Sequence, residues 1–256
     1  MEKISLIIMV LLATYVGFSS IINTKTLNNV IDKGFEITKN EYQLEELDIG
    51  EFKKILIYKV LPFNSKVYEI NKIGILAELK MNVGVMGIFS FNISPYYKDM
   101  PLITIEYVII LNNIKLIIEI YDLMLNKDEQ NYKNFLANIE EIKNKYSELK
   151  DDFDSGDAWY SEYVPAKIMK SGSILDDGKF LNLFSDVVSS YIDYSNKVLD
   201  LSQEDVKSKY NLIKNYSEKL AEKGGIAINN FKNTLGEQKT KEFLGKVIYG
   251  YDHIDI

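Results

Sequence analysis

The chain of 256 residues contains no cysteine, and its 30 basic residues of the Lys/Arg class are all lysine. Without cysteine, the chain forms no disulfides, thiolate metal sites or thiol nucleophiles. The single histidine, His253, lies near the C-terminus, so neither a histidine-rich metal site nor a Ser–His–Asp triad is expected. An anionic ligand would have to be held by lysine or by backbone amides, because no guanidinium group is present.

The charge balance excludes one further class of partner. The formal net charge is −7, so the chain lacks the basic surface that a phosphate backbone requires, and we expect no nucleic-acid partner. Hydrophobic residues make up 46% and charged residues 26% of the chain. This composition is typical of a globular protein with a substantial core.

The N-terminus carries a long uncharged stretch, residues 4–22. It is long enough to cross the hydrocarbon core of a membrane, and Gly17, Ser19 and Ser20 would permit cleavage by a signal peptidase. We therefore expect residues 1–22 to be a hydrophobic leader, either a signal peptide or a membrane anchor, and expect membrane association through this segment only. The protein would then follow the secretory pathway. The alternative is an apolar helix packed on the domain, with the protein in the cytoplasm or a plastid.

The rest of the chain divides into a polar connector, residues 23–49, and one domain, residues 50–256. The domain begins with strand-like runs in close succession, at 52–60, 66–73, 75–80, 83–94, 102–111 and 114–123, and a short strand is expected at 162–170. Short links between these runs favour antiparallel pairing. Helical spacing follows at 132–149, 180–192, 202–223 and 226–235 and again after Gly236. Strands followed by helices indicate an α+β fold in which helices cover an antiparallel sheet.

One hairpin carries candidate chemistry. Asn112-Asn113 suits a two-residue turn with positive φ, and counting outward from it places Glu106 opposite Glu119. Two carboxylates at that distance in a partly apolar place would raise one pKa, which is what a proton donor near neutral pH requires. The alternative is a face open to water on which the two glutamates point apart. The same face carries Thr104, Lys115 and Tyr121.

Several segments of the domain resemble the ferredoxin-dependent bilin reductases. They are Ser94-Pro95 with residues 100–108, Glu119-Ile120-Tyr121, Trp159 with residues 163–170, and Leu235-Gly236-Glu237 with Phe243-Leu244 and Val247-Ile248-Tyr249. They follow one another in the family's order, and the resemblance extends over about residues 50–250.

The resemblance implies an α/β/α sandwich, with a central antiparallel sheet flanked by helices, that binds a linear tetrapyrrole between the sheet and the C-terminal helices. It implies no bound cofactor or metal: reduced ferredoxin supplies electrons and acidic side chains supply protons. Glu106 stands where the family has its proton-donating acid, and Glu119 matches a second acidic position. Lys170 stands where the family usually has arginine. We therefore expect Glu106 and Glu119 to be catalytic, and Lys115, Lys170, Thr104 and Tyr121 to contact the ligand.

The chain also departs from the family pattern. Glutamate replaces the usual aspartate at position 106, no histidine lies near Phe89 or Phe91, and no arginine is present for the propionates. Three functions therefore remain open: a bilin reductase-like oxidoreductase, a protein that binds a tetrapyrrole or another flat apolar ligand without turnover, and a secreted or membrane-attached interaction domain that has kept only the fold.

Overall fold

The computed structural model describes the backbone of residues 2–152 and 158–256, and the side chains of residues 20–152, 158–225 and 227–256. Most of the predicted leader, residues 4–19, therefore lies outside the described side chains. A search of the described residues finds no helix with an apolar stretch long enough to cross a membrane.

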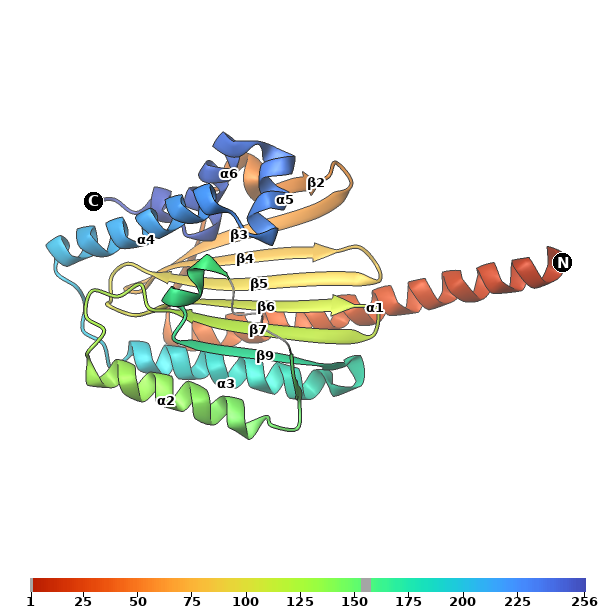
Figure 1. The fold of residues 1–256 in the computed structure, drawn as a ribbon, viewed down its shortest axis with the longest axis horizontal. Coiled ribbons are helices and arrows are strands. Elements are labelled where there is room, and N and C mark those ends of the chain that lie inside the picture. The colour runs from red at the N-terminus through yellow and green to blue at the C-terminus, as the bar shows by residue number, and fades with distance from the viewer. Residues whose placement is uncertain (1, 153–157) are drawn as a thin grey trace.

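The described residues form one sheet of nine strands in the order β1-β3-β4-β5-β6-β7-β9-β8, with β2 paired to β3 (Figure 1). The strands are β1 Leu44–Leu47, β2 Lys54–Ile57, β3 Leu61–Ile70, β4 Gly74–Asn82, β5 Met86–Pro95, β6 Leu102–Ile110, β7 Asn113–Tyr121, β8 Lys150–Asp151 and β9 Ala166–Ser173. Every pairing is antiparallel. The predicted run of antiparallel strands is confirmed, although residues 58–60 form a turn at the end of β2 and not part of that strand.

Helices cover both faces of the sheet (Figure 1). The first face carries α1 Glu2–Glu41, α2 Gln130–Lys145 and α3 Asp177–Ser195. The second face carries α4 Gln203–Lys223, α5 Ile226–Leu235, α6 Glu237–Phe243 and the short helices η1 Gly50–Lys53, η2 Trp159–Tyr163, η4 Leu244–Ile248 and η5 Tyr251–His253. The short helix η3 Ile174–Asp176 joins β9 to α3. The predicted α+β sandwich, with a central antiparallel sheet between helical layers, is confirmed.

Alternation along β6 and β7 separates two hydrophobic cores. Ile105 and Tyr107 of β6, like Leu116 and Ile118 of β7, are buried against α1, α2 and α3. The intervening residues point to the C-terminal helices, where Tyr121 joins the second core. This assignment of faces agrees with the sequence prediction, because a strand presents alternate residues to opposite sides of its sheet.

The predicted connector needs correction. Residues 23–49 are not a polar link, because α1 continues to Glu41 and is followed by β1, which pairs with β3. Leu27 and Val30 of α1 are fully buried in the first core. The side-chain amide of Asn23 donates to the carbonyl of Gly84 at 2.8 Å. The folded domain therefore begins within α1, well before residue 50.

The β6–β7 turn also differs from the prediction. Ile110 pairs with Asn113, so the two turn residues are Leu111 and Asn112, and Leu111 takes the positive φ of 56°. Neighbouring connections hold this turn, since the amide of Leu111 donates to Val85 O at 2.7 Å. The faces are unchanged because the register moves by two residues, and a strand repeats every two residues.

Candidate active site

A row of polar side chains crosses the sheet on the face that the C-terminal helices cover. Asn92 of β5 pairs with Thr104 of β6, Thr104 with Glu119 of β7, and Glu119 with Lys167 of β9. Directly opposed side chains on one face lie about 5 Å apart at Cβ, so the row is continuous. We call these four residues together with Glu106 the carboxylate row.

Glu119 is the most tightly held member of the carboxylate row. Its side chain is buried, with 9% exposure, and one carboxylate oxygen forms an ion pair with Lys167 Nζ at 2.7 Å. The other oxygen accepts a hydrogen bond from the Tyr121 hydroxyl at 2.6 Å. Both carboxylate oxygens of Glu119 are therefore held, one by an ammonium group and the other by a hydroxyl donor.

Glu106 lies diagonally across from Glu119 and not directly opposite, which corrects the predicted pairing. Its partners are Ser90 on β5 and Ile117 on β7, one of which is apolar. Burial raises the pKa of the Glu106 carboxyl, and the charge of Glu119 raises it further, while Lys115 and Lys167 act in the opposite direction. A half-buried carboxyl that holds its proton above the usual range is suited to donate that proton to a ligand on this face.

Tyrosine side chains enclose the Glu119 end of the row. The Tyr121 ring lies 5.6 Å from the Tyr216 ring, and Tyr216 lies 6.0 Å from Tyr249. Tyr160 of η2 adds a further ring 6.4 Å from Tyr121. Burial is the main cause that raises the pKa of Tyr121, Tyr216 and Tyr249, so all three hydroxyls stay protonated. The cluster therefore places neutral hydroxyl groups around the Glu119 carboxylate.

The structure brings five of the six predicted site residues onto one face. Glu106, Glu119, Thr104 and Tyr121 lie on neighbouring positions of β6 and β7, and Lys115 lies beyond Glu106, where it forms an ion pair with Asp152 at 2.8 Å.

The position of Lys170 contradicts the prediction that this residue contacts the ligand. It pairs with Leu116, which belongs to the first core, and therefore points to the opposite side of the sheet. Its buried ammonium group donates to Leu149 O at 3.2 Å and forms an ion pair with Asp151 at 2.8 Å. A ligand held by Glu106 and Glu119 would not contact Lys170.

The sequence prediction missed Lys167, Asn92 and the tyrosines of the C-terminal segments. Strand parity could have found Lys167, because residues three apart on a strand face opposite sides and only one of Lys167 and Lys170 can share the face of Glu119. Tyr216 and Tyr249 approach Glu119 from distant helical segments. No local sequence pattern reports such contacts.

Two surface hollows lie away from the carboxylate row. One, of about 460 Å³, runs along α1, and the other, of about 410 Å³, lies beside the C-terminal end of α3. Among the described residues, no cluster of three or more acidic or histidine side chains is placed to hold a metal ion.

The α/β/α sandwich of this chain has a counterpart among solved structures. Phytochromobilin synthase from tomato, solved in complex with biliverdin, is similar to this chain with a TM-score of 0.70 over 88% of this chain and 83% of that chain, at 15% sequence identity. No model of a known sequence family matches the chain, and no curated protein matches it in sequence. The predicted resemblance to the ferredoxin-dependent bilin reductases is thus confirmed at the level of the fold.

Proposed function

We propose that this chain is a bilin reductase-like oxidoreductase that binds a linear tetrapyrrole against the carboxylate row. The observation that carries the proposal is the raised pKa of Glu106, which lies beside the Glu119 carboxylate on the second face of the sheet. The fold supports it, because a solved protein of the same fold is in complex with biliverdin, a linear tetrapyrrole.

Four residues of the carboxylate row, and Lys115 beside it, have a part in this proposal. Glu106 donates a proton to the tetrapyrrole, and Glu119 keeps that proton on Glu106 until the ligand accepts it, because a second negative charge beside Glu119 is unfavourable. Lys167 holds Glu119 in place and offers a positive charge to a propionate. Half-buried Thr104 and Lys115 flank the two carboxylates and are further ligand contacts.

Reduction of one double bond of the tetrapyrrole takes up two electrons and two protons. In the proposed reaction reduced ferredoxin supplies the electrons one at a time and is itself oxidised. Glu106 supplies the two protons one after the other and regains each from solvent, with which its half-buried side chain is in contact. No bound cofactor is required for this balance.

The test uses the full chain in detergent with biliverdin, in the absence of oxygen. The visible absorption spectrum is recorded before and after the addition of reduced ferredoxin. We expect a bound-pigment spectrum that shifts to that of a reduced bilin. In Glu106→Gln the pigment should still bind, and its reduction should slow by about 100-fold or more, the usual contribution of a positioned proton donor.

Glu78→Gln is the matched control. Glu78 is also a glutamate whose pKa burial raises, but it pairs with Phe91 of the first core and so faces α1. Equal loss of reduction in both variants would contradict a specific role of Glu106. Binding without a spectral shift in the unmodified chain would favour a tetrapyrrole-binding protein without turnover. An unchanged biliverdin spectrum would favour an interaction domain that has kept only the fold.

A further inference from the structure

Four chain connections meet at one end of the sheet. Because neighbouring strands are antiparallel, the β2–β3, β4–β5 and β6–β7 turns and the segment that follows β9 all lie at this end. Three of the four carry large, exposed apolar side chains. These are Tyr58 and Val60, Ile110 and Leu111, and Leu175, the last of which is 91% exposed. We call these five residues the apolar rim.

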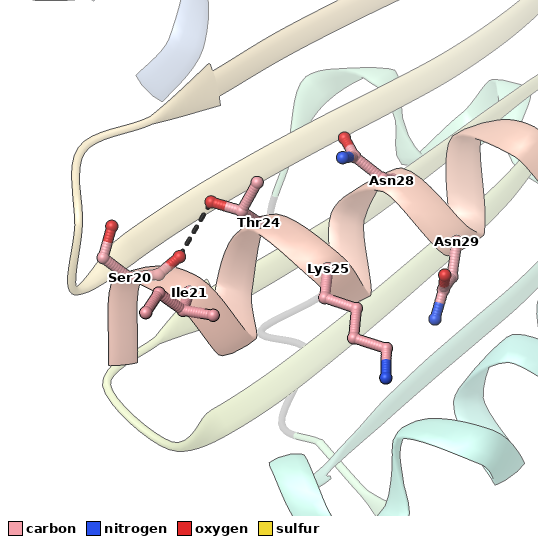
Figure 2. A pocket seen from close by; sticks show the side chains of 6 residues that line it. All are labelled: Ser20, Ile21, Thr24, Lys25, Asn28 and Asn29. Atoms are coloured by element: carbon pink, nitrogen blue, oxygen red, sulfur yellow. Dashed lines mark hydrogen bonds between the residues drawn. The ribbon is translucent and has the colours of Figure 1, made fainter. Parts of the chain in front are cut away.

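Helix α1 leaves the domain at the same end (Figure 1). Asn23 is bonded to Gly84 of the β4–β5 turn, and Thr26 donates to Asp177 at the start of α3 at 3.2 Å. Tyr42, after the C-terminal end of α1, is bonded to Asn196 at the other end of the sheet. Ile21, which is 69% exposed, therefore extends the apolar rim along α1, beside Ser20, Thr24 and Lys25 (Figure 2).

The length of α1 beyond the rim matches a lipid bilayer. The roughly 20 residues of α1 that precede Asn23 rise about 30 Å, close to the thickness of a hydrocarbon core. Residues 4–22 contain no charged side chain. Lys25 and Lys59, both exposed, lie where anionic headgroups would meet the rim.

We propose that the apolar rim rests on a lipid bilayer into which the N-terminal part of α1 is inserted, so that the strands stand upright on the membrane. A membrane is favoured over a protein partner because the rim lies at the end of the sheet from which an uncharged helical segment of bilayer length leaves the domain. The rim thus adds a docking surface to the predicted anchor.

The natural absence of cysteine makes the test direct. Single variants Leu111→Cys and Leu175→Cys of the full chain are labelled with an environment-sensitive fluorophore. The matched control is Leu199→Cys, because Leu199 is also a leucine, is 86% exposed, and follows α3 at the opposite end of the sheet. The labelled proteins are reconstituted into vesicles of phosphatidylcholine and phosphatidylglycerol, with and without nitroxide-bearing lipid.

We expect emission from the two rim positions to shift to shorter wavelength with vesicles and to lose intensity with nitroxide lipid, and emission from position 199 to change little. Equal behaviour at positions 111, 175 and 199 would overturn the proposal. A blue shift at the rim without vesicles, growing with protein concentration, would also overturn it, by assigning the rim to contact between copies of the chain.

Discussion

At the scale of single residues, the coupling between Glu106 and Glu119 is the central feature. The two carboxyls lie on adjacent strands, two pairs apart in register, and the charge of Glu119 raises the pKa of Glu106. Lys167 acts on the same pair with the opposite sign. Burial raises the pKa of Glu106 most, and Glu119, Lys115 and Lys167, all on the same face of the sheet, adjust it further.

Substitution of these neighbours should move the pKa of Glu106 in opposite directions. In Glu119→Gln the neighbouring negative charge is lost, so the pKa of Glu106 should fall. In Lys167→Met a positive charge is lost, so the pKa of Glu106 should rise. Titration of the Glu106 carboxyl carbon by ¹³C NMR measures both shifts. Movement in the same direction in the two variants would show that the geometry of the row is wrong.

At the scale of elements, the faces of the strands and the ends of α4 could be predicted from the sequence, whereas helix α1 could not. The β6–β7 faces followed from alternation, and Ser202 caps α4 by accepting from Asp205 N at 3.2 Å, while Gly224, with φ of 75°, ends that helix as expected. The polar composition of residues 23–41, by contrast, led to the wrong prediction of a connector where α1 continues. Its buried side includes Asn23, Thr26 and Thr38, polar residues that hydrogen bonds satisfy.

Two further features that the sequence prediction missed also depend on contacts between distant segments. Leu111 adopts a left-handed conformation that its residue type disfavours, because the β4–β5 turn and the segment after β9 bond to the β6–β7 turn. The tyrosines around Glu119 come from segments that meet only in the folded chain. Local sequence rules describe neither contact, since both depend on tertiary packing.

Helix α1 should contribute strongly to stability. Leu27 is fully buried and lies against Gly87 of β5, where an added Cβ would meet its side chain at 2.6 Å. Leu27→Ala should therefore lower the free energy of unfolding by about 3 kcal/mol, the usual cost of such a cavity. Urea unfolding measures it, and Lys25→Ala, on the exposed side of α1, serves as control. Equal midpoints would mean that α1 does not belong to the fold.

At the scale of the whole molecule, Lys209 joins the second helical layer to the sheet. Its ammonium group is fully buried and donates to Met100 O at 2.6 Å, to Leu123 O and to Asp99 at 3.3 Å. Burial lowers the pKa of Lys209 to about 8. One side chain of α4 thus holds the segments that follow β5 and β7.

Loss of this side chain should loosen the whole domain. Lys209→Met removes the donor of both carbonyls and the charged partner of Asp99, which keeps its hydrogen bonds from Leu125 N and Asn126 N, so we expect a loss of about 3 kcal/mol in the free energy of unfolding. Chemical unfolding followed by circular dichroism measures the loss. Lys207→Met, an exposed position on the same helix, should change it by less than about 0.5 kcal/mol. Similar losses in the two variants would contradict a clamp at Lys209.

The position of α1 in the chain also sets the order in which the domain can assemble. This helix precedes the strands in the chain, yet its partners at the two ends of α3 follow more than 150 residues later, since Thr26 bonds to Asp177 and Tyr42 to Asn196. Contacts of such long sequence separation form late, because closing the intervening loop costs chain entropy. During synthesis α1 can therefore dock on β4 and β5 first, and the side that packs against α3 stays uncovered until α3 has followed.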